Sequence, residues 1–425
     1  MKYGINDKPP LTPFLLYGLQ WWVVTLPSLV IMGVVTARLH SAEAAVQIWY
    51  MQKLFAIVGL ATTIQVLAGH RLPLVIGPAS TLLVGLIVSL GTGMDAAYTA
   101  IFFGGAVMSV AGFSGIFVKL RFFFTPRIVA VVLILIAFTL SPTILRLIVG
   151  DGSGAFPLCF ALLMVLALVV INYKLRGAAK SLTVLIGMAG GALVYCLFKG
   201  FPEGGYAFAK AADLPWGMRF VFEPGTLLAF VFCFLALVIN DLGSIEAVGH
   251  MLEAETMDKR IRRGMGVTGI ANMASGWFGV IGPVDYSMSA GVIAATGCAS
   301  RFTLVPAGIG LAVCGFFPEL VMLLVAIPGP VMGALLLYLM ATQLSNGLAM
   351  LVKKNSITDF TSGVIVGLPL MIGLIIAFAP APVFNTFPEM LRPVVSNGFV
   401  MGTLAVILFE HGVFKNACCA PKGLL

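Results

Sequence analysis

Residues 75–80 read Val-Ile-Gly-Pro-Ala-Ser, and residues 280–283 repeat Val-Ile-Gly-Pro 205 positions later. A second pair of matching segments lies at almost the same distance, because Pro126 precedes one apolar stretch and Pro330, 204 positions on, precedes another. One such match could arise by chance. Two matches at nearly one offset indicate a duplicated unit that occupies about half of the chain.

The composition is that of a membrane protein. Apolar residues make up 60% of the chain and charged residues 10%, against roughly 45–50% and about 25% in soluble domains. Apolar runs of about 20 residues, long enough to cross a bilayer, recur along the whole sequence. The first, Leu15–Val35, lacks a small-residue cleavage site and is too long for a signal-peptide core, so we expect a retained helix. The sequence predicts a single membrane domain over residues 1–425.

The apolar runs predict an all-α polytopic membrane protein with 14 transmembrane segments. Seven segments in each half is an odd number, so the second half enters the membrane from the opposite side, and we expect inverted repeats over 12–199 and 225–412. The third and tenth segments look short or interrupted. The segments are centred near residues 25, 57, 82, 105, 137, 165, 190, 235, 271, 291, 312, 337, 369 and 403.

Segments three and ten are expected to hold short strands. Extended backbone at Leu74–Ala79 and at Ile281–Asp285 would leave N–H and C=O groups unpaired inside a membrane unless the two stretches pair or face a cavity. Helices that start after each strand would direct their positive N-terminal dipoles at that cavity. Transporters with inverted repeats bind their substrate where such discontinuous helices meet.

The basic residues predict the orientation. With a cytoplasmic N-terminus, 18 of the 25 Lys and Arg residues lie inside and seven outside, so the positive-inside rule favours two cytoplasmic termini in a bacterial-type cytoplasmic (inner) membrane. The net charge of +8 is explained by this bias. No nucleic-acid partner is expected, because the largest basic cluster is the short loop Lys259–Arg263.

No metal or other cofactor is expected. The seven cysteines have no metal-type spacing, and most lie inside apolar segments, where we interpret them as small apolar core residues. The pair Cys418-Cys419 follows the last segment. A short tail is our interpretation of that pair, with lipidation or redox activity left open.

Three acidic residues are predicted inside membrane spans, namely Asp241, Glu246 and Asp285. A carboxylate at the bilayer centre costs at least about 2.5–3.5 kcal/mol, so it normally faces a cavity, a partner or a substrate. Asp285 falls in the interrupted tenth segment, close to the expected site. Asp241 lies about 140° around the helix from Glu246, so a structural role and a proton-coupling role both stay open.

Glu246 and His250 are four residues apart and share one helix face. A carboxyl in a medium of low dielectric takes up a proton more readily than one in water, which is the property that a proton-coupled carrier needs. Which group carries the proton is left open. The other histidines, His40, His70 and His411, are interpreted as loop or interface residues.

Five motifs follow one another over most of the chain. They are Leu72-Pro73 with Gly77, Glu246-Ala247-Val248-Gly249-His250, Ser275-Gly276-Trp277-Phe278-Gly279, Gly291-Val292-Ile293-Ala294-Ala295-Thr296-Gly297, and Ile327-Pro328-Gly329-Pro330-Val331-Met332-Gly333. In order and spacing these motifs resemble the nucleobase–ascorbate transporter family, which includes bacterial uracil and xanthine permeases.

The resemblance implies a core domain and a gate domain, with substrate held between segments three, ten and eight. It implies that Glu246 hydrogen-bonds the ring N–H groups of a nucleobase and that His250 tunes it. Backbone at Ser287 would complete the contacts, and Tyr338 would line the gate side. It also implies proton symport, with H⁺ more probable as coupling ion than Na⁺, and a homodimer.

Three substrate-facing positions depart from the family pattern. The polar pair of the tenth segment is replaced by Met288 and Ser289, the Gln-His pair of the first appears as Gln20-Trp21, and the stacking aromatic of the third aligns with Ser80. Without that polar pair, one edge of a bound base would lack hydrogen-bond partners. Each buried unpaired group would cost about 1–3 kcal/mol of binding free energy. Either Asp285, one turn before Met288, supplies the acceptor, or the cargo is another molecule.

The sequence predicts a secondary transporter for a nucleobase-like heterocycle of the uracil and xanthine class. A carrier of anions or of a different small organic molecule on the same fold is the alternative, since helix N-termini at the midplane suit anions. An enzyme is not expected, because no nucleophile elbow, zinc helix or Walker-type phosphate loop occurs in the sequence.

Overall fold

The computed structural model describes residues 1–120, 125–150, 155–175, 182–200, 217–286, 288–353, 356–384, 386–388 and 391–414. Cys418, Cys419 and Ser287 lie outside these residues. The expected centres of all 14 segments fall within helices, which confirms the predicted segments. Eight described helices are long and apolar enough to cross a membrane singly, and a ninth span is counted if the pair Arg301–Cys314 and Pro318–Val325, bent by 87°, forms one segment.

The two halves have the same order of elements, which is the order that a duplicated unit requires. The first half runs through α1 (Leu11–His40), α2 (Ala44–Leu67), β1 (Val75–Pro78), α3 (Ser80–Val88), α4 (Met94–Ser114), α5 (Ile116–Leu120), α6 (Pro126–Thr139), α7 (Ser141–Val149), α8 (Ala155–Lys174) and α9 (Thr183–Lys199). The second half runs through α10 (Pro224–Met251), α11 (Met257–Trp277), β2 (Pro283–Tyr286), α12 (Ser289–Thr296), α13 (Leu304–Cys314), α14 (Pro318–Val325), α15 (Gly329–Lys353), α16 (Phe360–Phe378), the short α17 (Ala381–Phe384) and α18 (Arg392–Val395), and α19 (Gly398–Leu408).

The helix starts follow local capping chemistry. α6 begins with Pro126 after Thr125, whose hydroxyl accepts the backbone N–H of Ile128 at 3.3 Å. α10 likewise begins with a proline, after Glu223, whose carboxylate accepts two backbone N–H groups of the first turn. At the start of α16, Asp359 and Ser362 form a reciprocal capping box. Each cap satisfies N–H groups that the helix itself leaves unpaired.

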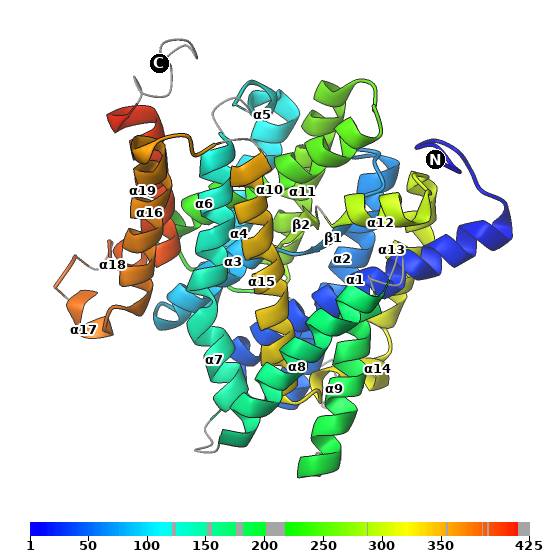
Figure 1. Cartoon of the computed structure of the whole chain (residues 1–425), viewed down its shortest axis with the longest axis horizontal. Coiled ribbons are helices and arrows are strands. Elements are labelled where there is room, and N and C mark those ends of the chain that lie inside the picture. The colour runs from blue at the N-terminus through cyan, green and yellow to red at the C-terminus, as the bar shows by residue number, and fades with distance from the viewer. Residues whose placement is uncertain are drawn as a thin grey trace.

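The predicted strands meet at the centre of the molecule (Figure 1). β1 and β2 pair antiparallel, with Val75 opposite Tyr286 and Pro78 opposite Pro283. Gly77 is required where the strands meet, because a Cβ there would lie 2.6 Å from the ring of Tyr286. The pair joins segment three to segment ten and confirms the expected strands.

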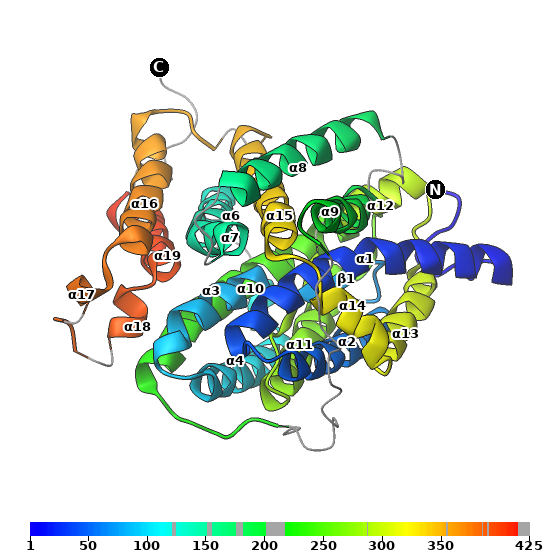
Figure 2. The same ribbon diagram turned by 90° about the horizontal axis from the view of Figure 1, so that it is seen from below.

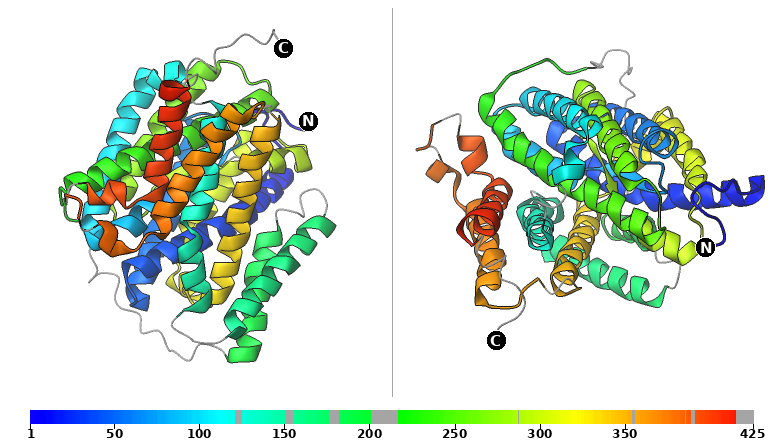
Figure 3. Two further views of the ribbon diagram at one scale, coloured as in Figure 1. Left: turned by 60° about the vertical axis from the view of Figure 1, so that its left-hand side comes forward. Right: turned by 90° about the horizontal axis from the view of Figure 1, so that it is seen from above.

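The helices form two bodies, and the strand pair belongs to one of them (Figure 2). The core body comprises α1 to α4, α10 to α13 and both strands, and the gate body comprises α6 to α9, α15, α16 and α19. Within the core body α4 and α11 approach closely, since a Cβ at Gly269 would lie 2.3 Å from the backbone nitrogen of Ser109. In the gate body α16 and α19 pack together and against α6 (Figure 3). The strands therefore lie in the core body and face the gate body.

Candidate functional site

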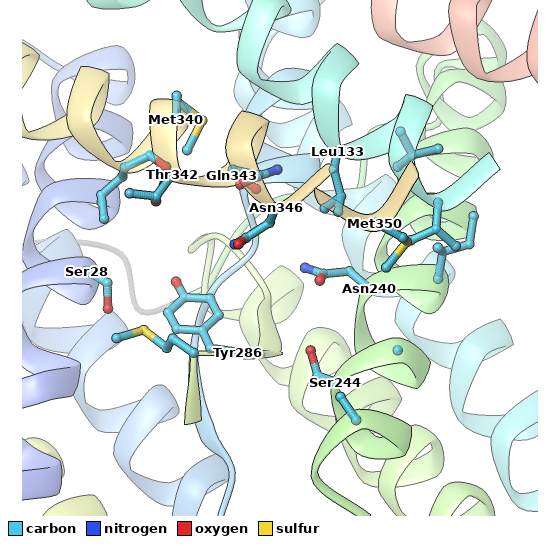
Figure 4. Close-up of a pocket in the computed structure, with 18 of the residues that line it drawn as sticks. Ser28, Leu133, Asn240, Ser244, Tyr286, Met340, Thr342, Gln343, Asn346 and Met350 are labelled. Atoms are coloured by element: carbon cyan, nitrogen blue, oxygen red, sulfur yellow. Dashed lines mark hydrogen bonds between the residues drawn. The ribbon is translucent and has the colours of Figure 1, made fainter. Parts of the chain in front are cut away.

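A cavity of about 270 Å³ lies where the two bodies meet (Figure 4). The core body contributes α1, α10 and the two strand–helix units, and the gate body contributes α6 and α15. Drug-sized ligands occupy pockets of roughly 300–1,000 Å³, so this cavity suits a smaller molecule. Its lining residues are Ser28, Met32, Pro78, Ser80, Val129, Val132, Leu133, Ile239, Asn240, Gly243, Ser244, Ala247, Tyr286, Met288, Leu339, Met340, Thr342, Gln343, Asn346 and Met350.

The polar lining consists of amides and hydroxyls, and no lining residue of the described chain is charged. Asn240 and Ser244, four apart on α10, lie on one helix face, and Gln343 and Asn346, three apart on α15, lie on another. Figure 4 shows the side chains of Asn240, Asn346 and Tyr286 pointing into the same space from different elements. Each amide offers both donors and an acceptor, so this arrangement can read the edge of a polar heterocycle.

Both half-helices begin at this cavity. α3 starts at Ser80, and α12 starts at Ser289 directly after Met288, with no side-chain cap at either start. Ser80 and Met288 are both lining residues. The positive ends of the two helix dipoles therefore lie at the cavity, as the interrupted segments predict.

Side chains satisfy the extended backbone around the strands. The backbone N–H of Val75 donates to the hydroxyl of Ser289 at 2.9 Å, and that of Ile281 donates to the hydroxyl of Tyr50 at 2.9 Å. The amide of Asn272 donates to the carbonyl of Pro283 at 2.9 Å. Non-helical backbone is thus tolerated at membrane depth because the protein itself supplies the partners.

The residues predicted for the substrate site fall into two groups. Ser80 and Met288 line the cavity. Ser289 does not, because its buried hydroxyl also donates to the carbonyl of Tyr286 at 2.8 Å and so holds β2 to the start of α12. Asp285 is also not among the lining residues, and its fully buried carboxylate lies beside His70 instead.

The remaining predicted residues lie around the cavity rather than on its lining. Glu246 is half-buried and precedes the lining residue Ala247, and His250 is exposed one turn further along α10. Tyr338 is buried on α15, one residue before the lining residue Leu339. Ser287 lies outside the described residues.

His70 lies in the loop between α2 and β1, as expected, but its side chain has no exposed surface there. Gly69 and Arg71 around it suggest a solvated turn, but the turn folds beneath α11, where Arg260 donates to the carbonyl of His70 at 3.0 Å. Burial by a helix distant in sequence is a tertiary effect that local composition does not reveal.

The sequence analysis missed the three amides Asn240, Gln343 and Asn346. Their signal was present, because polar side chains inside an apolar span usually face a cavity or a partner. Asn240 directly precedes the intramembrane acid Asp241, and the two side chains lie on different faces of α10, because only Asn240 lines the cavity. The amides come from both bodies, Asn240 from α10 and Gln343 and Asn346 from α15.

Known proteins are similar to this chain in sequence and in fold. The Permease family model Xan_ur_permease matches residues 13–381. The nucleobase transporter PlUacP of Paenibacillus larvae is 25% identical over 83% of this chain and 83% of its own. The uric acid permease PucJ of Bacillus subtilis is 26% identical over 83% of this chain and 82% of its own.

A solved structure supports the architecture independently. The transmembrane domain of a cyanobacterial bicarbonate transporter, BicA, superposes with a TM-score of 0.62, covering 88% of this chain and 98% of that domain. The two sequences are 18% identical, so the likeness concerns the fold alone. The match to the Permease family model over most of the chain is what assigns the family: this protein is a multi-pass membrane permease of the nucleobase–ascorbate transporter family, and not an enzyme.

Proposed function

We propose that the protein carries a nucleobase-like heterocycle of the purine and pyrimidine class across the membrane, coupled to protons. The observation that supports this most directly is the uncharged cavity with amides on both bodies, at the starts of the two half-helices. Donors and acceptors on Asn240, Gln343 and Asn346 complement the N–H and C=O groups at the edge of such a ring. Alternating access would follow from the core body rocking against the gate body around the cavity.

The names of two relatives support the proposed class of substrate. Their names specify nucleobase and uric acid transport. Family side chains are replaced here at Ser80 and Met288 on the cavity lining and at Ser289, which follows Met288. The set of heterocycles accepted by this chain is therefore expected to differ from that of the relatives. The thioethers of Met288, Met340 and Met350 offer a deformable apolar wall for the flat face of a ring.

An anion carrier on this fold is the less favoured function. Such a site needs compensation of negative charge, and among the described residues the cavity lining contains no Lys, Arg or His. The helix dipoles alone provide only a fraction of a charge each. The uncharged lining therefore favours a polar heterocycle over a small inorganic anion.

Glu246 and His250 remain candidates for substrate binding and proton coupling. Glu246 neighbours the lining residue Ala247, and a modest rotation of α10 would bring its carboxylate toward the ring N–H groups of a substrate. His250, on the same face one turn away, would then lie next to that carboxylate. Tyr338 on α15 and the backbone at Ser287 would complete the contacts.

We further infer a cytoplasmic (inner) membrane location, two cytoplasmic termini and a homodimer. The distribution of basic residues supports the orientation. Exposed apolar residues on α8, such as Leu163, Leu166 and Val170, support a lipid-facing or subunit-facing surface of the gate body.

Uptake into proteoliposomes tests the proposed function. Purified protein is reconstituted and offered labelled xanthine, uric acid, uracil, bicarbonate and chloride, each with and without a pH gradient that is acidic outside. We expect saturable uptake of at least one heterocycle, stimulated by the gradient, and no uptake of the two anions. Uptake of bicarbonate or chloride without any heterocycle would assign the protein to the anion carriers instead.

A further inference from the structure

A second polar cluster lies behind the strand pair, outside the substrate cavity. It consists of His70, Asp241 and Asp285, whose side chains have no exposed surface and do not line the cavity. Nε2 of His70 lies 3.4 Å from Oδ1 of Asp285. Oδ1 of Asp241 accepts the backbone N–H of Asp285 at 2.9 Å. Three ionisable groups from α10, β2 and the turn before β1 thus meet in a dry part of the core body.

The hydrogen bonds fix the form of His70. Its Nδ1 accepts the backbone N–H of Leu72 at 2.9 Å, so Nδ1 carries no hydrogen. The ring is therefore neutral, with its hydrogen on Nε2, which lies 3.4 Å from Oδ1 of Asp285 and makes no hydrogen bond among the described residues. His70 brings an unused donor to the cluster but no positive charge.

No cation compensates the two carboxylates within the described part of the chain. The guanidinium of Arg260 is half-buried at the edge of the cluster and donates to the carbonyls of His70 and Arg71, at 3.0 and 2.8 Å. The polar side chains of Gln65 on α2 and of Thr268 and Asn272 on α11 also pack against the cluster, and all three are uncharged. Gln65 and Asn272 donate to oxygens of α11 and β2.

Both carboxylates also keep oxygens without a hydrogen bond. Oδ2 of Asp241 and both side-chain oxygens of Asp285 have no hydrogen-bond partner among the described residues. Two ionised carboxylates would repel each other there, and each would remain desolvated. One proton removes one of the two charges and turns one unpaired oxygen into a donor for another, so protonation of one carboxylate stabilises the cluster.

We propose that Asp241 and Asp285 form the binding site of the coupled proton, held apart from the substrate on the opposite face of β2. The inference rests on the proposed transport function. A proton taken up outside converts one carboxylate to a carboxyl, and its release inside restores the carboxylate, with no other bond changed. A sodium ion fits less well, because Nε2 of His70, which carries a hydrogen, lies only 3.4 Å from Oδ1 of Asp285, and no described group of three acidic, His or Cys residues could hold a metal.

The strand connects the two sites mechanically. Successive side chains of a strand point to opposite faces, so Asp285 faces the cluster whereas Tyr286 lines the cavity. Ser244 belongs to both sites, because it lines the cavity and donates to the carbonyl of Asp285 at 3.0 Å. Loss of the proton makes the carboxylates repel each other and displaces β2, and with it the substrate contact of Tyr286.

The experiment separates proton movement from substrate movement. Full-length wild type, Asp241→Asn and Asp285→Asn are reconstituted, and labelled xanthine is followed in two assays: exchange at equal pH on both sides, and accumulation driven by a pH gradient. We expect both variants to keep exchange within a few-fold of wild type and to lose accumulation by about tenfold or more. Glu319→Gln, on the exposed start of α14, is the matched control and should behave as wild type in both assays.

An infrared measurement tests the site without transport. Substrate-free wild type at pH 7 should show the C=O stretch of a protonated carboxyl, and the Asp241→Asn/Asp285→Asn double variant should lack it. Undiminished gradient-driven accumulation in both single variants, absence of the band from wild type, or accumulation driven by a sodium gradient alone would each overturn the proton site. If wild type exchanges none of the heterocycles, the proposed transport function fails, and the infrared band still decides on the proton.

Discussion

At the scale of single residues, the polar chemistry of the cavity depends on Asn240 from the core body and on Gln343 and Asn346 from the gate body. Because both bodies contribute amides, a bound ring would form hydrogen bonds to two bodies that move relative to each other during transport. Binding would then hold the bodies together, which is what an occluded state requires. The amides of the gate body are therefore expected to affect both affinity and the coupling of closure to binding.

We predict that Asn346→Leu weakens transport through binding. The variant leaves a hydrogen-bonding group of the ring unsatisfied, which costs about 1–3 kcal/mol. A loss of 1.4 kcal/mol corresponds to about a tenfold rise in KM for heterocycle uptake. Ser345→Ala, on an exposed position of the same helix, is the control and should leave KM unchanged. Equal KM values for Asn346→Leu and wild type would exclude this amide from the site.

Glu246→Gln is predicted to abolish uptake while the protein stays folded. The substitution keeps the size of the side chain but replaces one of the two carboxylate oxygens, which would accept ring N–H groups, by an NH2 donor. Uptake and thermal unfolding are measured on the same preparation, so loss of activity can be separated from loss of structure. Unchanged uptake would remove Glu246 from the binding site and leave the amides as its main polar contacts.

The sequence predicts single residues well where the repeat and the resemblance coincide. Ser80 and Met288 flank the predicted half-helix starts, and the structure places both on the cavity. Asp241 and Asp285 were recognised as intramembrane acids, but His70 was not connected with them. The connection depends on the fold of a turn between α2 and β1 against α11, which no local pattern encodes.

At the scale of elements, the repeated Val-Ile-Gly-Pro predicts β1 and β2 because proline and glycine together disfavour a continuous helix there, and the freed backbone groups must find partners. What the pattern could not reveal is how the rest of the extended backbone is satisfied. The partners are side chains from α2, α11 and α12, namely Tyr50, Asn272 and Ser289. Such partners are specific to the tertiary arrangement.

Gly77→Ala is predicted to disturb the strand pair and the cavity together. The added Cβ would lie 2.6 Å from ring atoms of Tyr286, so the ring must move out of its place on the cavity lining. Overpacking of this kind costs about 1–3 kcal/mol of folding free energy. In this variant the temperature of thermal unfolding should fall and the KM for heterocycle uptake should rise.

The matched control is Gly91→Ala at the end of the same segment. A Cβ at Gly91 meets no atom within 4 Å, so stability and KM should stay at the values of wild type. If Gly77→Ala behaved like this control, the close approach of β1 to Tyr286 would not matter for binding.

At the scale of the whole molecule, the structure brings together loops that the predicted topology assigns to one side. The backbone of the N-terminal segment pairs with the loop after α12, through Ala299 to Tyr3 at 2.9 Å and Arg301 to Ile5 at 3.1 Å. Arg301 also donates to the carbonyl of Val66 at the end of α2. Counting spans from a cytoplasmic N-terminus places the ends of segments two and ten inside as well, so contacts and count agree.

The opposite side shows the same agreement. Arg38, after the first span, donates to the carbonyl of Ile327, after the eleventh, at 2.6 Å. Lys53, near the outer end of the second span, donates to the carbonyl of Phe278, after the ninth, at 2.6 Å. Odd-numbered spans end outside in the predicted topology, so both contacts join elements of one side.

These contacts show which loops lie on the same side of the membrane. Which of the two sides faces the cytoplasm can be tested with epitope tags. Basic residues are enriched on the side of the N-terminus, so we predict that an N-terminal epitope tag is detected only after cells are permeabilised. A tag inserted between α1 and α2, at residues 41–43, should be detected on intact cells. Detection of the N-terminal tag on intact cells would invert all of these loops at once, because the contacts oblige them to change sides together.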